Sequence, residues 1–219
     1  MITRSGMLEA LRRHRLVAVV RGSDRAASVR TALVLAEEGV PLIEVSLSGR
    51  DALGAIEDIA RAVGGSVALG AGTALTGDDV RRARDAGARY IVTPSLGAGV
   101  DEALRLDLPV LAGALTPTEV AAAVAAGVTA VKLFPASANG PGYLRALRDP
   151  FPDVPFVPVG GVGEEEAAAF LARGALAVGV GSPLCGDAPS GGDLEALRRR
   201  ARAFVAVAGA AAPVPGGSS

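Results

Sequence analysis

A single lysine, Lys132, stands in the middle of an apolar run over residues 131–135. The sequence holds 22 Lys plus Arg residues, and all the others are Arg. Arg cannot replace Lys where chemistry needs a neutral primary amine, because guanidinium stays protonated. The structural alternative is a satisfied core lysine, or a lysine that packs its stem on an edge strand while its head reaches water. The rarity of lysine in this chain favours a reactive amine.

Two other charged residues, Glu44 and Arg21, could assist a reaction at such an amine. Apolar surroundings and a nearby Arg both favour the neutral amine, which attacks a ketone to form a Schiff base. The resulting iminium accepts electrons, so a neighbouring C–C bond can break or form. A carboxylate at Glu44 can shuttle the protons, and Arg21 offers a fixed cation for a substrate carboxylate.

The same three residues also have purely structural interpretations. Glu44 and Lys132 could form a buried ion pair kept for specificity, although replacing such pairs by apolar residues often costs no stability. Arg21 could instead cap helix carbonyls at the rim of the fold. These alternatives stay open at the level of the sequence.

The elements that would position these residues alternate regularly along the chain. A first helix over residues 1–15 is followed by eight apolar strands and eight helices, at about 25 residues per unit, which is typical of a (β/α)8 barrel. The last helix is expected over residues 193–208. We predict one TIM-barrel domain over residues 1–209 with an N-terminal helix, and a disordered tail over 210–219. An open, doubly wound sheet is disfavoured because no G-x-G-x-x-G follows the first strand.

Period-two alternation within the strands predicts which side chains point into this barrel. In residues 41–47, Glu44 lies on the face opposite the apolar Ile43 and Val45. In the run that contains Lys132, the alternate positions are again apolar. Arg21 ends the first strand, on the face of its alternate valines. We therefore expect Glu44, Lys132 and Arg21 together at the C-terminal end of the barrel, where barrel enzymes build their active sites.

Two glycine-rich turns follow the seventh and eighth strands. They contain Gly160 and Gly161, and Gly181 and Ser182. Barrels often bind phosphate on backbone N–H groups of these two loops, where glycine allows close approach. Tight-turn packing is the alternative for either run alone, but the two together favour a phosphate site.

Composition restricts the remaining classes of function. Hydrophobic residues make up 50% of the 219 residues and the formal net charge is −1, so no electrostatic feature favours nucleic acid or a membrane surface. One Cys and one His cannot form a disulfide or a zinc cluster. No stretch approaches the roughly 20 apolar residues of a membrane helix. We expect a cytoplasmic protein without metal or organic cofactor that acts on a small molecule.

Six segments in order carry a family resemblance. They are Ile43-Glu44-Val45, Gly70-Ala71-Gly72-Thr73, Val92-Thr93-Pro94, Val131-Lys132-Leu133-Phe134-Pro135-Ala136, Gly140-Pro141 and Pro158-Val159-Gly160-Gly161-Val162. Between about His14 and Leu184 the sequence resembles the 2-keto-3-deoxy-6-phosphogluconate / 4-hydroxy-2-oxoglutarate (KDPG/KHG) aldolases.

The resemblance implies a metal-free class I aldolase, usually a homotrimer. By this resemblance, Lys132 would be the residue that forms the Schiff base, and Glu44 would be the residue that transfers protons. The pyruvate pocket would be lined by Thr73, Pro94 and Phe134. The phosphate would be bound by Gly160, Gly161, Gly181 and Ser182.

Two positions depart from the common pattern of this family. Many phosphogluconate-type members carry a Thr before the strand-7 glycines, where this chain has Val159; the related 2-keto-3-deoxy-6-phosphogalactonate aldolases look similar in carrying Val. Some members place an Arg where this chain has Ser48, and Arg21 would then bind the carboxylate. We predict relaxed selectivity at the substrate's C4 hydroxyl, because Val159 cannot form a hydrogen bond.

Three alternatives remain beside cleavage of a keto-deoxy-phospho sugar acid to pyruvate and glyceraldehyde 3-phosphate. The first is a 4-hydroxy-2-oxoglutarate aldolase that forms pyruvate and glyoxylate. The second is a phosphate-binding barrel isomerase or synthase, which needs no Schiff-base lysine. The third is a non-catalytic sugar-phosphate binder, disfavoured because inward-facing Glu44 and Lys132 would be costly without a use.

Overall fold

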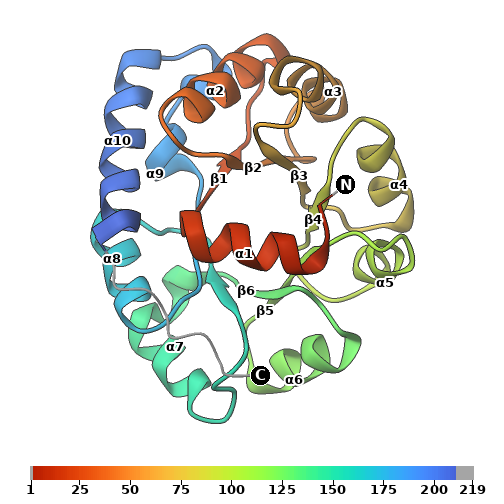
Figure 1. Cartoon of the computed structure of the whole chain (residues 1–219), viewed down its shortest axis with the longest axis vertical. Helices are drawn as coiled ribbons and strands as arrows, with labels where there is room; N and C mark the ends of the chain where they lie inside the picture. Colours follow the sequence, from red (N-terminus) through yellow and green to blue (C-terminus); the bar gives the residue numbers. More distant parts are fainter. Residues whose placement is uncertain (1, 211–219) are drawn as a thin grey trace.

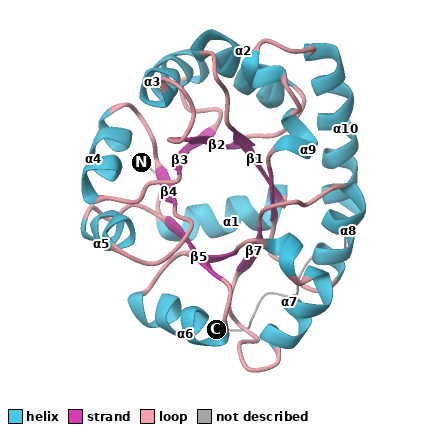
Figure 2. Ribbon diagram, turned by 180° about the vertical axis from the view of Figure 1, so that it is seen from behind, coloured by secondary structure: helices cyan, strands magenta, loops and turns pink. Residues whose placement is uncertain are grey.

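The computed structural model describes residues 2–210 and shows a parallel barrel of eight strands inside a ring of helices (Figure 1, Figure 2). From β1 to β7 each strand pairs with the next one in sequence, and β1 also pairs with β8. A bridge between Val159 and Gly179 closes the remaining gap between β7 and β8. The predicted (β/α)8 fold is confirmed.

The elements have the following bounds. The strands are β1 Leu16–Val20, β2 Leu42–Ser46, β3 Ala68–Gly72, β4 Tyr90–Val92, β5 Val110–Ala114, β6 Ala130–Leu133, β7 Phe156–Pro158 and β8 Val178–Val180. The helices are α1 Arg4–His14, α2 Arg25–Glu37, α3 Ala52–Val63, α4 Gly77–Asp85, α5 Ala98–Arg105, α6 Pro117–Ala126, α7 Gly140–Arg148, α8 Glu164–Ala172, α9 Ser182–Cys185 and α10 Leu194–Ala210. Two 3-10 turns, η1 Ala136–Ala138 and η2 Ala188–Ser190, complete them.

The alternation along each strand divides the hydrophobic core into two clusters. The outer cluster fills the layer between strands and helices and takes Ile43 and Val45 from β2. The inner cluster fills the barrel and takes the alternate residue Leu42, together with Val17 and Val19 of β1. Glu44 has the parity of Leu42, so the strand that packs apolar residues outward turns Glu44 inward.

Helix α1 closes the N-terminal mouth of the barrel. It lies across the ring of strands in Figure 1, and its Met7 and Leu11 are fully buried in the inner cluster. The side chain of Thr3 accepts a hydrogen bond from the Gly6 N–H and thereby caps the helix. This cap places the first helical residue at Arg4, later than the sequence pattern predicts. With this mouth closed, the barrel interior opens only at the C-terminal ends of the strands.

The segment after β8 differs from the sequence-based expectation. It forms the short helix α9 and the turn η2 before α10, where the sequence pattern predicts only a loop. Helix α10 ends at Ala210, so this residue belongs to the helix and not to the predicted tail; residues 211–219 lie outside the described part of the chain. The limits of the domain, predicted as residues 1–209, stay a prediction.

No helix of the described residues is long and apolar enough to cross a membrane.

Candidate active site

Glu44 is the buried carboxylate of the barrel interior. It lies on β2 and is 3% exposed, and its carboxyl carbon would be only 2.9 Å from a Cβ placed at Gly72 of β3. The glycine therefore makes the room that the carboxylate occupies. Burial raises the pKa of Glu44 above its usual value, while the positive charges of Lys132 and Arg21 lower it by a smaller amount. A carboxyl whose pKa is raised by burial can both accept and donate a proton.

Lys132 lies on β6 and is also buried, at 6% exposed. Its Nζ is 4.9 Å from the centroid of the Phe134 ring, which has the same parity along the strand. This cation–π distance shows both side chains on the inner face. None of the ion pairs in the described part of the chain joins Lys132 to Glu44, although their charges interact. The arrangement therefore differs from the contact ion pair considered from sequence.

Arg21 follows β1 directly and is exposed at the rim of the barrel. Its charge lowers the pKa of Glu44, so the guanidinium acts on the same interior that holds the carboxylate. An exposed cation above two buried charged groups can attract an anionic substrate into the barrel.

A chain of hydroxyl groups starts at Ser46, two residues beyond Glu44 on β2 and not among the predicted site residues. The Ser46 Oγ is 3.0 Å from Thr73 Oγ1 and 2.8 Å from Ser48 Oγ. Ser46 is buried at 1% exposed and shares the inward parity of Glu44 on β2. The alternation of residues along β2 could therefore have predicted that Ser46 points into the barrel. Thr73 adopts a left-handed backbone with φ 61°, which turns the chain out of β3 directly above the barrel.

Pro94 approaches the barrel because of a glycine on the neighbouring strand. Gly113 of β5 pairs with Lys132 of β6. A Cβ at Gly113 would lie against the backbone carbonyl of Pro94. The missing side chain lets the loop after β4 close over the interior near Lys132.

The two predicted phosphate loops leave neighbouring strands at the same end of the barrel. Gly160 and Gly161 have φ values of 100° and 71°, in the region that favours glycine. Gly160 packs against the Phe134 ring, which a Cβ would approach to 3.1 Å. Gly181 caps α9, and Ser182 is exposed as its first residue. The loop after β7 thus packs against Phe134, which directly follows β6, while the loop after β8 lies beside Val19 of β1.

Val159 contributes only methyl groups to this region. It is 7% exposed within the inner cluster, and a Cβ on Gly179 would meet its Cγ2 at 2.7 Å. Its backbone N–H donates to the Leu133 carbonyl, and its own carbonyl accepts from the Ala136 N–H. The polar atoms of Val159 are therefore occupied by β6 and η1, and its side chain offers no hydrogen bond.

A second interior residue that the sequence analysis missed is Tyr90 of β4. Its ring is fully buried in the inner cluster. Its hydroxyl has no hydrogen-bond partner among the described residues, and burial, followed by the negative charge of Glu44, raises the pKa of the phenol. No motif marks this tyrosine, and its significance depends on what lies beside it.

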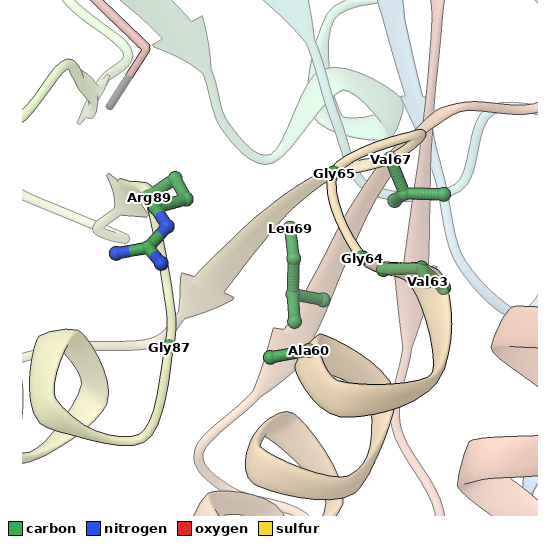
Figure 3. A pocket seen from close by; sticks show the side chains of 8 residues that line it. All are labelled: Ala60, Val63, Gly64, Gly65, Val67, Leu69, Gly87 and Arg89. Carbon is green, nitrogen blue, oxygen red and sulfur yellow. The ribbon is translucent and has the colours of Figure 1, made fainter.

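A cavity of about 260 Å³ lies outside this site (Figure 3). It is lined by the end of α3 and by the chain before β3 and β4, including Val63, Gly87 and Arg89. These segments lie at the N-terminal ends of the strands. The cavity is therefore separate from the site around Glu44 and Lys132.

The described residues contain no cluster of three or more His, Cys, Asp or Glu that could bind a metal ion.

Comparison with known proteins gives a consistent result. The family model for KDPG and KHG aldolases matches residues 7–199. A probable 2-dehydro-3-deoxy-6-phosphogalactonate aldolase of Rhizobium meliloti (strain 1021) is 37% identical over 195 residues, which are 87% of this chain and 90% of the relative. The 2-dehydro-3-deoxy-6-phosphogalactonate aldolase of Escherichia coli (strain K12) is 32% identical over 192 residues, which are 87% of this chain and 92% of that relative. A solved structure, native KDPGal, matches with a TM-score of 0.82 at 31% identity and covers 88% of this chain and 93% of its own. The chain therefore belongs to the KDPG and KHG aldolase family.

Proposed function

We propose that this aldolase cleaves a 2-keto-3-deoxy-6-phospho sugar acid reversibly to pyruvate and glyceraldehyde 3-phosphate, through a Schiff base on Lys132. One observation carries the proposal: the only lysine of the chain is buried inside the barrel, within electrostatic reach of a buried carboxylate whose pKa is raised. The names of the relatives support the substrate class.

The first stage joins the substrate to Lys132. The neutral amine attacks the C2 ketone to form a carbinolamine, and loss of the C2 oxygen as water gives the iminium. Glu44 supplies the proton that this oxygen needs to leave. Burial raises the pKa of Glu44 and so favours the protonated form that this step needs.

The second stage breaks the bond between C3 and C4. Glu44, now a carboxylate, accepts the proton of the C4 hydroxyl as the C3–C4 electrons move into the iminium. Glyceraldehyde 3-phosphate leaves as the aldehyde, and an enamine of pyruvate stays on Lys132. Glu44 then returns its proton to C3, and water hydrolyses the resulting iminium to free pyruvate and the amine. The one carboxyl group thus moves a proton in each direction.

The substrate's two anionic ends would be bound at different parts of the rim. Arg21 and the Thr73 hydroxyl are suited to the carboxylate beside Lys132, with Pro94 and Phe134 lining the pyruvate pocket. Backbone N–H groups of Gly160, Gly161, Gly181 and Ser182 are suited to the phosphate, because barrels often bind phosphate in the loops after strands 7 and 8. Val159 directly precedes the glycines of the loop after β7, and we infer relaxed selectivity at the C4 hydroxyl from its apolar side chain.

Borohydride reduction in the presence of pyruvate tests the Schiff base. Reduction should add a pyruvate-derived mass to the peptide that contains Lys132, and turnover should be lost in parallel. The Lys132→Arg variant provides the matched control, because it keeps the charge but has no neutral amine. Folded wild-type protein without an adduct at Lys132, or a Lys132→Arg variant with full activity, would refute the mechanism.

The family description also includes KHG aldolases, so 4-hydroxy-2-oxoglutarate is the second candidate substrate. It has no phosphate and would leave the two glycine loops unused. We expect the gluconate-type and the galactonate-type phosphorylated substrates both to give a higher kcat/KM than 4-hydroxy-2-oxoglutarate. The decisive measurement is turnover of the gluconate-type, galactonate-type and oxoglutarate substrates under one set of conditions.

We further propose that the enzyme is a homotrimer in the cytoplasm. The family resemblance supports the trimer. Light scattering on the purified protein should give three times the chain mass; a monomer mass would contradict the proposal.

A further inference from the structure

Tyr90 occupies the barrel interior at the level of the proposed proton shuttle. The register of three neighbouring strands places Glu44 of β2 beside Gly70 of β3, and Gly70 beside Tyr90 of β4. All three residues point inward, but the middle one has no side chain. Tyr90 and Glu44 are therefore inward-facing neighbours across an empty position.

The Tyr90 ring fills the space that Gly70 leaves. A Cβ at Gly70 would lie 2.6 Å from both Cε1 and Cε2 of the ring, and its nearest contact would be Cζ, the carbon that carries the hydroxyl. The hydroxyl end of the ring thus lies over Gly70 and toward β2. The carboxyl group of Glu44 lies over Gly72, the next inward position along β3. The phenol is placed beneath the carboxylate, on the side away from the open mouth.

The hydroxyl of Tyr90 is a buried donor without a partner among the described residues. Buried tyrosine hydroxyls normally find a hydrogen-bond acceptor. The inner faces around it offer mainly apolar side chains and glycines, and the Ser46 hydroxyl is already engaged by Thr73 and Ser48. Glu44 is the acceptor with which the phenol interacts electrostatically.

The charged groups near this pair are few. Lys132 on β6 and Arg21 after β1 both act on Glu44. Arg15, which is also buried, precedes β1 at the opposite mouth. Helix α1 adds only the apolar Met7 and Leu11 to the inner cluster. The Tyr90 phenol is thus an uncharged donor beside a carboxylate on which two cations, Lys132 and Arg21, also act.

We propose that Tyr90 is a positioning residue that donates a hydrogen bond to the carboxylate of Glu44 during turnover, directly or through one water. The bond would fix the carboxylate between its two proton transfers. As a donor to the charged form, the phenol also favours the base state of Glu44 and opposes the effect of burial. This inference rests on the proposed function, because Tyr90 would position the carboxylate that transfers protons in that reaction.

The Tyr90→Phe variant removes the hydroxyl and keeps the ring that fills the Gly70 space. Tyr143→Phe is the matched control, because Tyr143 is the other tyrosine of the chain and its hydroxyl donates to the Leu115 carbonyl at 2.8 Å. We expect Tyr90→Phe to lower kcat by about tenfold, as for a lost hydrogen bond to a charged group, with KM nearly unchanged. We expect Tyr143→Phe to leave kcat unchanged.

The pH profile distinguishes positioning from packing. Without the phenol the pKa of Glu44 rises, so the carboxylate is lost at a higher pH and the acid limb of kcat moves upward in pH. A ring that only fills space would leave this limb in place. The exchange of pyruvate methyl protons for deuterium, followed by NMR, reports the same proton transfer without the second substrate. It should slow in Tyr90→Phe by the same factor as kcat.

The outcomes separate this inference from the function on which it rests. A wild-type enzyme that forms no borohydride adduct at Lys132 overturns both. An adduct in both proteins, with slowed exchange and a shifted acid limb in Tyr90→Phe alone, supports the role of Tyr90. An adduct in both proteins with equal exchange rates and identical pH profiles overturns the role of Tyr90 and leaves the aldolase mechanism standing.

Discussion

At the scale of single residues, the site depends on which face of a strand each side chain occupies. Period-two alternation was enough to predict Glu44 and Lys132 inside the barrel, and both are buried there. The same alternation also predicts an inward-facing Ser46, whose hydroxyl contacts Thr73. It does not reveal the importance of Tyr90, because that depends on Gly70 being its neighbour across the sheet.

Replacing Glu44 by Gln should abolish proton transfer while keeping the shape of the side chain. We expect kcat to fall by about 10²- to 10⁴-fold, the usual contribution of a general acid–base group. The measurement is pyruvate release under saturating substrate. Glu9→Gln on the exposed side of α1 is the control for the same chemical change. A Glu44→Gln enzyme with near wild-type kcat would assign the proton transfers to another group.

Replacing Val159 by Thr should restore a polar contact to the C4 hydroxyl. Both residues are β-branched and similar in size, so the barrel packing is preserved while one methyl becomes a hydroxyl. We expect the ratio of kcat/KM for the gluconate-type over the galactonate-type epimer to rise about tenfold. Comparison of the two epimers in wild type and variant gives this ratio. A wild-type enzyme that already prefers the gluconate epimer strongly would contradict the assigned role of Val159.

At the scale of elements, helix α10 is held against α2 by an acidic residue with two partners. Glu38 accepts from Arg198 at 2.8 Å and from Arg202 at 2.6 Å. These two guanidinium groups lower the pKa of Glu38 from 4.5 to about 2. The side chain is 11% exposed, against 60% for its neighbour Glu37, which contacts Arg198 alone.

The stability supplied by Glu38 should therefore depend on pH in a defined direction. A lowered pKa in the folded state gives stability that is complete above 4.5 and is lost as the pH falls through about 2. We expect Glu38→Gln to destabilise the protein at neutral pH and the difference from wild type to shrink between these two values. Urea unfolding at several pH values measures it. Glu37→Gln is the matched control and should have a smaller effect; equal effects would contradict the role of the shared contact.

The start of a helix depends on a few neighbouring residues. At the start of α6, Thr116 and Glu119 form a capping box with Pro117 as the first helical residue. The short α9 and η2 were not predicted. The turn η2 is anchored by α2, because the Ser28 hydroxyl donates to the Pro189 carbonyl across 161 positions of the chain.

At the scale of the whole molecule, the barrel has one closed mouth and one open mouth. Helix α1 closes the N-terminal mouth, so substrate and water reach Lys132 only from the loops at the other end. In Figure 2, α1 lies behind the ring of strands. All residues with a proposed role in substrate binding follow strands at the open end, which matches the usual division of barrels into a stability face and a catalytic face.

Removal of metal ions should leave turnover unchanged, because the iminium on Lys132 would provide the electron sink that a Lewis acid provides in other aldolases. The measurement is the rate of pyruvate release before and after dialysis against EDTA. A parallel sample that is dialysed and then supplied with Zn²⁺ or Mg²⁺ is the control. A rate that falls on dialysis and recovers with either ion would contradict the Schiff-base mechanism.

The sequence by itself determined the barrel class and the inward direction of Glu44 and Lys132. Both follow from the order and period of apolar residues, which are local properties of a strand or helix. Only the tertiary structure decided that Glu44 occupies the space over Gly72 and that the Tyr90 ring lies over Gly70. These relations depend on the register between strands separated by 20 or more residues, which hydrogen bonding across the closed barrel sets.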